Sequence, residues 1–203
     1  MNKKAIKHLK SDPVMAGVID KVGPLDFVPR MLPPFHSLVH SIIHQQLSGK
    51  AADTILKRFV ALFGGEDFPS PEAVAAMDPN TLRAAGLSLP KAGYVKDVAR
   101  RALDGLIPSL EECRLLSDNE LIERLTAIKG VGQWTVEMLL IFNFGRPDVL
   151  PIGDLGVRRG YQIAYRKRSM PTEKQLQTHG KKWIPYRTTA ALYLWKTVDF
   201  LKG

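Results

Sequence analysis

Apolar side chains recur along this chain at helical spacing, and no segment alternates between apolar and polar residues as a half-buried strand does. Between residues 36 and 47, for example, Leu38 and Ile42 lie one helical turn apart. Two further segments open with a capping residue followed by a proline, at Ser70-Pro71 and at Asp78-Pro79. These patterns predict an all-α fold of short helices joined by short turns.

The other predicted helices also have recognisable ends. Ser117 and Glu120 have the spacing of a capping box, which predicts a helix from there to about Ala127. Further helices are expected at residues 51–63, 133–144 and 185–201, with a polar, lysine-rich segment after Pro171. The chain contains no convincing repeat or low-complexity tract.

The charge of the chain is strongly positive. It has 29 Lys and Arg against 20 Asp and Glu, a net charge of +9 and a pI near 9.7. Such a surface attracts polyanions, above all nucleic acids. Charge alone is also compatible with a soluble basic protein that binds no nucleic acid. A hydrophobic content of 45% and a charged content of 24% exclude the disordered and membrane-embedded classes.

A single cysteine, Cys113, excludes a disulfide framework, a Cys₄ zinc site and an iron–sulfur cluster. The lysine-rich beginning of the chain lacks the apolar core of a signal peptide, and no apolar stretch approaches the roughly 20 residues of a membrane span. We therefore expect no membrane association. We expect the protein in the cytoplasm, associated with the nucleoid, or in the nucleus if the organism is a eukaryote.

The most informative segment is a Gly-x-Gly turn, Gly130 to Gly132, between a predicted helix that ends and one that begins. Glycines permit positive φ and close backbone approach, and amides at the start of a helix can bind a phosphate oxygen. Such a contact holds DNA without reading its bases. By itself, the turn is equally compatible with an ordinary connection between two helices.

The wider segment from Leu125 to Thr135 closely resembles the hairpin of the helix-hairpin-helix (HhH-GPD) DNA glycosylase superfamily. The resemblance implies contacts with the DNA backbone by Gly130, Gly132, Gln133 and Thr135. It also implies a monovalent cation, Na⁺ or K⁺, that bridges the hairpin to a DNA phosphate. The implied ligands are the backbone carbonyls of Thr126, Ile128 and Val131. No other cofactor is expected.

A second match lies 20 residues after Trp134, where the stretch 150–154 ends in Asp154. The superfamily carries its catalytic aspartate in such a Leu-Pro-x-x-Asp stretch, so the resemblance implies that Asp154 is catalytic. Cleavage of an N-glycosidic bond builds oxocarbenium character on the sugar, and a fixed anion stabilises that charge and can steer the attacking water. Asp154 could instead cap a helix that begins at Leu155, and the two roles are compatible.

Bifunctional members of the superfamily place a lysine two residues after the second hairpin glycine, where its amine forms a Schiff base and the strand is nicked. In this chain that position is Trp134. The resemblance therefore implies a monofunctional enzyme that leaves the strand intact. A tryptophan at this place is the pattern of the 3-methyladenine DNA glycosylase II branch.

The segment 183–195 is similar to the same branch, in which a Trp-x-Pro-aromatic-Arg stretch leads to a tryptophan that lines the base pocket. Trp195 takes that place, and Trp134 and Met138 are expected beside it. Electron-rich rings attract cationic alkylpurines, by roughly 0.5–2 kcal/mol per contact. Met138 stands where close relatives can carry another aromatic residue, which implies a more open or less selective pocket. The alternative is that these aromatic residues belong to the core.

The segment 45–52 resembles the loop that fills the gap left by an extruded base, with Leu47 as the inserted side chain. An apolar plug offsets part of the stacking lost on extrusion. The alternative is that Leu47 closes the core stripe of its helix. A phosphate-binding P-loop is excluded, because His44 and Ala51 stand where that motif needs glycine and Ser or Thr.

Three histidines, His36, His40 and His44, lie four residues apart on one predicted helix face. Such a row can bind a metal ion, but three ligands from one helix seldom converge on one ion. A face directed at DNA, with His44 nearest to Leu47, is the favoured interpretation.

The resemblance covers about residues 35–201 and implies one glycosylase unit, 1–203, with a cleft between two helical lobes. The lobes are expected at 36–146 and at 1–35 with 147–203. The implied function is hydrolysis of 3-methyladenine and 7-methylguanine from double-stranded DNA by a monomer. Two alternatives stay open. One is a glycosylase for uracil, hypoxanthine or ethenoadenine, and the other is a non-catalytic DNA-binding module, which the paired matches of Asp154 and Trp195 disfavour.

Overall fold

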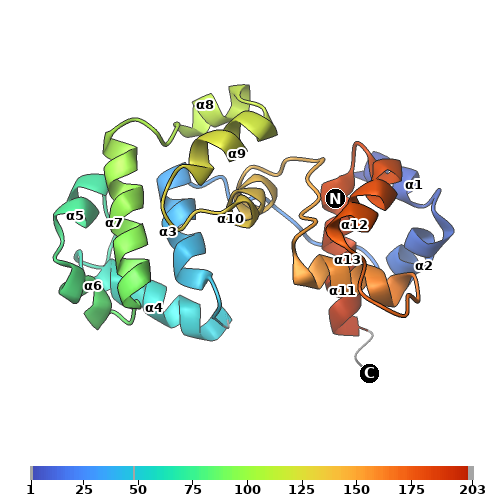
Figure 1. The fold of residues 1–203 in the computed structure, drawn as a ribbon, viewed down its shortest axis with the longest axis horizontal. Coiled ribbons are helices and arrows are strands. Elements are labelled where there is room, and N and C mark those ends of the chain that lie inside the picture. Colours follow the sequence, from blue (N-terminus) through green and yellow to red (C-terminus); the bar gives the residue numbers. More distant parts are fainter. Residues whose placement is uncertain (1, 48, 201–203) are drawn as a thin grey trace. The chain divides into compact units, whose positions relative to one another are not determined.

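The computed structural model describes residues 2–47 and 49–200, and every regular element in these ranges is a helix (Figure 1). In chain order the α-helices are α1 Lys3–Leu9, α2 Pro13–Val22, α3 Pro34–His44, α4 Gly49–Ala61, α5 Pro71–Ala76, α6 Pro79–Ala84, α7 Leu89–Leu103, α8 Leu110–Leu115, α9 Asp118–Thr126, α10 Gln133–Met138, α11 Leu155–Ala164, α12 Glu173–Gly180 and α13 Arg187–Phe200. A π-helical turn, Leu139–Asn143, follows α10, and a 3-10 turn, Lys181–Trp183, follows α12. The prediction of an all-α fold is confirmed.

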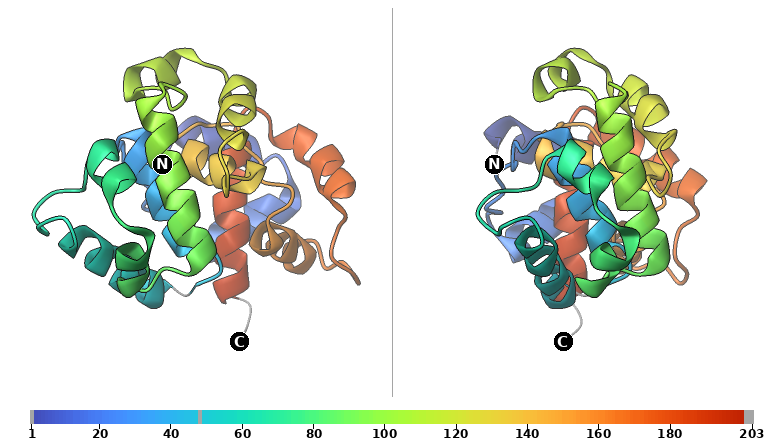
Figure 2. Two further views of the ribbon diagram at one scale, coloured as in Figure 1. Left: turned by 60° about the vertical axis from the view of Figure 1, so that its left-hand side comes forward. Right: turned by 90° about the vertical axis from the view of Figure 1, so that its left-hand side faces the viewer.

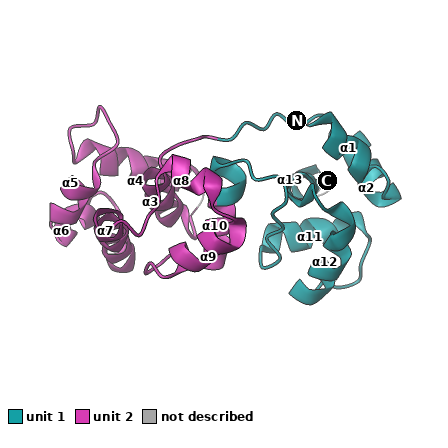
Figure 3. Cartoon of the chain, turned by 90° about the horizontal axis from the view of Figure 1, so that it is seen from above, with its two compact units in different colours: residues 1–29, 140–203 teal, residues 30–139 magenta. Residues whose placement is uncertain are grey.

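The chain divides into two compact units, which Figure 3 shows in different colours. Unit 1 contains residues 1–29 and 140–203, and unit 2 contains residues 30–139. The sequence places the middle lobe at 36–146, so both of its observed limits lie earlier. Arg30 already belongs to unit 2, where its guanidinium lies 3.4 Å from the His40 ring. Phe142 belongs to unit 1, because its ring packs on Phe27 and Trp195.

Side-chain caps begin many of the helices, as the sequence predicts. The Ser70 hydroxyl accepts a hydrogen bond from the backbone amide of Ala73, and the Asp78 carboxylate accepts from two amides at the start of α6. Ser117 and Glu120 form the predicted capping box of α9. Each such cap stabilises a helix by about 1 kcal/mol, which matters for helices of one or two turns.

Helix α7 is the centre of unit 2, because both α3 and α5 pack against it (Figure 2). The predicted apolar stripe of α3, which includes Leu38 and Ile42, is fully buried. However, α3 ends at His44 and does not reach Leu47 as predicted. The backbone of Gln45 leaves the helical conformation, with ψ of 129°, and Gln46 adopts a left-handed conformation, with φ of +58°.

Unit 1 is built on the close packing of α11 against α13. At their contact, Gly160 is required because a Cβ there would collide with the main chain of Leu194. The largest side chains of this core include Trp183 and Tyr193, which are both 1% exposed. The last helix begins at Arg187, two residues after the predicted start at Pro185.

The predicted helix at 133–144 is interrupted. Its first part is α10, and its second part is the π-helical turn Leu139–Asn143. Because π-helical turns insert an extra residue, they change the direction in which the following side chains point. Phe142 lies in this turn and reaches the candidate site described below.

Candidate active site and DNA-binding hairpin

Asp154 caps the amino-terminal end of α11. Its side-chain Oδ1 accepts a 2.8 Å hydrogen bond from the backbone amide of Val157. The capping role that the sequence allows for Asp154 is therefore present. The cap also places a carboxylate in one orientation at a helix terminus whose dipole favours negative charge.

Trp195 holds the same carboxylate from α13. Its indole Nε1–H donates a 2.8 Å hydrogen bond to Asp154 Oδ1, so this oxygen accepts two bonds. Gly156 leaves room for the indole, because a Cβ there would lie 2.8 Å from Trp195 Cδ1 and 3.1 Å from Asp154 Oδ1. The structure thus brings together the two predicted site residues of unit 1, which lie 41 positions apart in the sequence.

Two phenylalanines that the sequence interpretation misses extend the aromatic wall beside Trp195. The ring of Phe142 lies 5.5 Å from the Trp195 ring, and the ring of Phe27 lies 6.0 Å from that of Phe142. Phe142 follows Met138 by four residues, and this spacing is a signal that could have identified it. Phe27 lies in an irregular segment with no pattern that predicts its contacts. The wall offers apolar, electron-rich faces next to a carboxylate.

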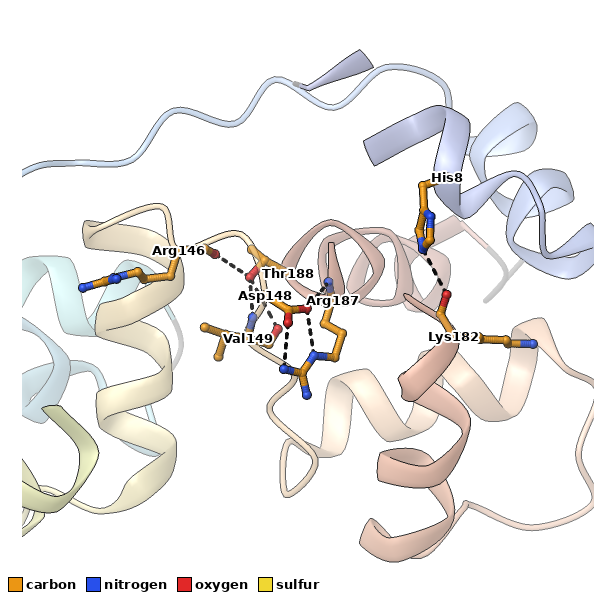
Figure 4. A network of polar contacts seen from close by, with 7 residues as sticks. All are labelled: His8, Arg146, Asp148, Val149, Lys182, Arg187 and Thr188. Carbon is orange, nitrogen blue, oxygen red and sulfur yellow. Dashed lines mark hydrogen bonds and ion pairs between the residues drawn. The ribbon is translucent and has the colours of Figure 1, made fainter. Parts of the chain in front are cut away.

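A polar network ties the segment that leads to Asp154 to the start of α13 (Figure 4). The Arg187 guanidinium donates two hydrogen bonds, of 2.8 and 2.9 Å, to the Asp148 carboxylate. The Thr188 hydroxyl donates a 2.6 Å bond to the carbonyl of Arg146. Because α13 also carries the tryptophan that bonds to Asp154, both ends of this segment are fixed to the same helix.

In unit 2, the predicted hairpin connects α9 to α10, and α7 supports it. Gly130 has a φ of +82°, and a Cβ at this position would collide with the ring of Tyr94. The backbone amide of Lys129 donates a 2.9 Å hydrogen bond to Asp97 Oδ2. The turn is therefore fixed in shape by its own unit and needs no DNA to form.

Gly132 and Gln133 are exposed where the hairpin enters α10. Gly132 has a φ of −91°, and a Cβ there would meet nothing within 4 Å. Its glycine is thus not required by the fold of this unit. The side-chain amide of Gln133 donates a 3.0 Å bond to Glu137. Their contacts with the DNA backbone stay a prediction.

Thr135 is a correction to the predicted DNA contacts. It is 2% exposed, its Oγ1 accepts a 3.2 Å bond from Gln45 Nε2, and its amide donates to the carbonyl of Gly132. Its hydroxyl oxygen, its amide and its carbonyl, which accepts from the Leu139 amide, all have partners within the described structure. We therefore assign Thr135 to the support of the hairpin and not to the DNA backbone.

The three carbonyl residues predicted to hold a monovalent cation line one open hollow of about 740 Å³ beside the hairpin. They are Thr126, Ile128 and Val131. The Ile128 carbonyl accepts a 3.1 Å bond from the Val131 amide, and a carbonyl oxygen has a second lone pair for another partner. Neutral carbonyl oxygens suit a weakly hydrated monovalent ion, so the donor set fits the prediction.

Leu47 lies beyond the end of α3 and is 41% exposed. The alternative that it closes the core stripe of its helix is therefore wrong. Its insertion into DNA stays a prediction, and Ser48, the next residue of the expected loop, lies outside the described residues.

The histidines of α3 do not form a metal site, since the described residues contain no group of three potential ligands that could hold an ion. The rings of His40 and His44 stack at 4.0 Å, and His36 stacks on Phe68 at 4.1 Å. Burial, with the charges of His44 and Arg30, lowers the pKa of His40 to about 4. That His44 faces DNA stays a prediction.

Trp134 is 41% exposed on α10, so the alternative that it is a core residue is wrong. Met138, at the end of the same helix, is half-buried. Their place in a base pocket stays a prediction. In the described ranges, no helix is both long and apolar enough to span a membrane.

The family profile described as "HhH-GPD superfamily base excision DNA repair protein" matches residues 39–186, which include the hairpin and Asp154. The chain belongs to this superfamily. The helical fold, the hairpin turn and the carboxylate at a helix terminus are thus features of an HhH-GPD protein.

Relatives within the HhH-GPD superfamily are similar over most of the chain. DNA-3-methyladenine glycosylase 1 of Schizosaccharomyces pombe is 46% identical over 164 residues, which cover 81% of this chain and 72% of the relative. A solved structure of 3-methyladenine DNA glycosylase from the same organism, in complex with abasic DNA, matches with a TM-score of 0.92 and 41% identity over 99% of both chains. A crystal structure of DNA-3-methyladenine glycosidase from Bacillus halodurans matches with a TM-score of 0.87 and 38% identity, covering 100% of this chain and 92% of that chain.

Proposed function

We propose that this HhH-GPD protein is a monofunctional DNA-3-methyladenine glycosylase of base excision repair, acting as a monomer on double-stranded DNA. Its substrates are alkylated purines, above all 3-methyladenine and 7-methylguanine. The observation that carries the proposal is the Asp154 carboxylate, held by two N–H donors beside the rings of Trp195 and Phe142. The names of the relatives, a 3-methyladenine glycosylase and a 3-methyladenine glycosidase, support the same reaction.

The proposed chemistry follows from the charge of the substrate. A purine alkylated at N3 or N7 is a cation, so its glycosidic bond is already weakened and needs no strong general acid. As the bond breaks, positive charge moves to the sugar, and Asp154 stabilises that charge and orients water for attack. Trp195 and Phe142 present electron-rich ring faces to the cationic base.

The proposed DNA contacts come from unit 2. The backbone amides of Gly132 and Gln133, two exposed residues, hold a phosphate at the start of α10. Leu47, exposed at the end of α3, fills the gap that the extruded base leaves. For Trp134 and Met138, the proposed role is contact with the extruded base.

The product is an abasic site in an intact strand, because Trp134 stands where a lyase carries its nucleophilic lysine. An indole cannot form a Schiff base with the sugar. Borohydride treatment of a reaction in progress should therefore trap no covalent protein–DNA species. A trapped adduct that persists through further purification would remove the monofunctional part of the proposal.

One experiment tests the function directly. The protein is incubated with methylated duplex DNA, and the released bases are identified by mass spectrometry, with uracil, hypoxanthine and ethenoadenine duplexes in parallel. We expect rapid release of 3-methyladenine and 7-methylguanine. Rapid release of uracil with no release of methylpurines would favour a different lesion, and DNA binding with no release of any base would favour a non-catalytic module.

A further inference from the structure

One side chain joins the loop at residues 45–47 to the hairpin of unit 2. Gln45 Nε2 donates a 3.0 Å hydrogen bond to the carbonyl of Gly130 and a 3.2 Å bond to Thr135 Oγ1. Gly130 belongs to the hairpin turn and Thr135 to α10. A shift of Gln45 relative to the hairpin therefore breaks both hydrogen bonds.

Lys91, on α7, holds the main chain of the same loop. Its Nζ donates hydrogen bonds of 2.8 and 2.6 Å to the carbonyls of Ile43 and Gln45. Carbonyls at the end of a helix have no partner within the helix, and bonds from an ammonium group to them are stronger than neutral ones. Lys91 thus stabilises the sharp change of direction at Gln46, whose φ is +58°.

The hairpin rests on the same helix as the loop. Tyr94 fills the space beneath Gly130, and Asp97 accepts from the amide of Lys129. Residues 91, 94 and 97 lie three apart, on one face of α7. The loop and the hairpin therefore both pack on α7, and Gln45 links them to each other directly.

We propose that Gln45 and Lys91 are positioning residues, which lock the DNA-inserting loop to the phosphate-binding hairpin. When the hairpin grips the backbone, Leu47 is then already placed for insertion. This inference rests on the proposed function, in which Leu47 fills the gap left by the base. The physical advantage is preorganisation, because a loop that moved independently would lose conformational entropy on insertion, in addition to the stacking lost on extrusion.

The chain offers a matched control on the same helix. Lys96 is half-buried like Lys91, and its Nζ donates to the carbonyl of Met77, which directly follows α5 and lies far from the hairpin in the sequence. Both Lys91→Met and Lys96→Met remove ammonium-to-carbonyl hydrogen bonds, two at Lys91 and one at Lys96, and keep an unbranched aliphatic side chain. Gln45→Leu removes the amide donor at similar size, and Lys91→Arg restores a cation that can reach both carbonyls.

Three quantities are measured for each variant: the thermal midpoint, the affinity for undamaged duplex, and the single-turnover rate of base release at saturating protein. A 2-aminopurine beside the lesion reports extrusion by its fluorescence. We expect Lys91→Met and Gln45→Leu to slow extrusion and release by about tenfold or more, with affinity for undamaged duplex nearly unchanged. Lys96→Met should also lose thermal stability but release bases at the normal rate, and Lys91→Arg should recover most of the rate.

The inference is overturned if Lys91→Met and Lys96→Met slow release equally, since the contact would then serve stability alone. It also fails if Leu47→Ala releases bases at the normal rate while the unaltered protein acts on methylpurines, because the loop would have no part in extrusion. If the unaltered protein releases no base at all, the proposed function fails instead. The fluorescence change on undamaged and abasic duplexes then still separates Lys91→Met from Lys96→Met.

Discussion

At position 154, aspartate and asparagine differ in charge but not in their ability to cap a helix. An asparagine Oδ1 can accept both the Val157 amide and the Trp195 indole N–H, so α11 should keep its start. Asp154→Asn therefore removes the charge alone. We expect base release to fall by about 10²- to 10³-fold, the usual loss when an electrostatic stabiliser of the transition state is removed. DNA affinity and the melting temperature should change little, and near-normal turnover by this variant would end the catalytic assignment.

Trp195 combines an aromatic face with a hydrogen bond to Asp154, and two substitutions separate these roles. Trp195→Phe keeps a ring but removes the indole N–H, so the carboxylate loses one of its two supports. We expect release of every substrate to slow by a similar factor, about tenfold, which is about 1.4 kcal/mol of transition-state stabilisation. Trp195→Ala also removes the face, and should lose additional rate on cationic 7-methylguanine but not on neutral hypoxanthine. Equal rates for Trp195→Phe and the unaltered protein would show that the hydrogen bond has no catalytic part.

The two hairpin glycines are expected to respond differently to alanine. At Gly130 the left-handed φ and the Tyr94 ring both oppose a Cβ, so Gly130→Ala should lower the melting temperature. At Gly132 the backbone is ordinary and the space is open, so Gly132→Ala should fold normally. Its added methyl group should instead weaken binding to duplex of any sequence, measured by fluorescence anisotropy. If Gly132→Ala binds normally, the amides at the start of α10 do not approach a phosphate.

At the scale of elements, Asp12 joins the start of α2 to two other parts of unit 1. Its carboxylate caps Val14 and accepts from Lys182 at 2.8 Å and from the Tyr165 hydroxyl. Burial raises the pKa of Asp12, but the hydrogen bonds from Lys182, Tyr165 and Val14 outweigh burial and lower it from 3.8 to about 2. A pKa lower in the folded state than in the unfolded state stabilises the fold above the unfolded value.

This shift predicts a pH-dependent stability difference. Asp12→Asn should lower the free energy of unfolding at pH 7 by about 2 kcal/mol. The difference should be constant above about pH 4 and vanish as the pH falls through about 2, because the Asp12 carboxyl is then protonated in both states. Urea unfolding of the variant and the unaltered protein at several pH values measures this difference in the free energy of unfolding. The contributions of titrating groups that both proteins share cancel in the difference. Asp20→Asn, at a 65%-exposed side chain paired with Lys10, is the control and should cost little.

The sequence predicts those elements whose signals are local. The caps at Ser70, Asp78 and Ser117 begin helices as expected, because a side chain bonding to an amide two or three residues away needs no distant partner. The end of α3 is mispredicted by three residues, since Lys91, 46 residues from Gln45, sets that end. The π-helical turn is missed for a related reason, as a continuous apolar run does not reveal where a helix register changes.

The residues of the candidate site also differ in whether a local sequence signal predicts them. Asp154, Trp195 and the hairpin glycines are predicted from the sequence because each stands in a short local motif. Phe27 is not found, since only its packing on Phe142 connects it to the site. The sequence also does not predict the surroundings of Thr135, because the side chain that bonds to its hydroxyl oxygen, Gln45, lies 90 residues earlier.

For the molecule as a whole, the excess of positive charge belongs to one unit. Unit 1 contains 17 Lys and Arg against 7 Asp and Glu, whereas unit 2 contains 12 against 13. The hairpin unit thus has little net charge with which to attract DNA. Its proposed grip relies on backbone amides, which bind a phosphate without neutralising it. Attraction through charge must come mainly from Lys and Arg of the unit that carries Asp154.

These two kinds of contact predict different responses to salt. Contacts by Lys and Arg release counterions, so the logarithm of the affinity for undamaged duplex should fall linearly with the logarithm of salt concentration, with a slope of about −0.9 per phosphate neutralised. We expect several phosphates, given the net charge of +9. Gly132→Ala should lower the affinity at every salt concentration and leave the slope unchanged, because the lost contact is uncharged. Anisotropy titrations between low and physiological salt measure the salt dependence of affinity for the unaltered protein and for Gly132→Ala.

A slope near zero for the unaltered protein would contradict charge-driven binding. A slope that changes in Gly132→Ala would mean that the hairpin acts by placing basic side chains and not through its amides.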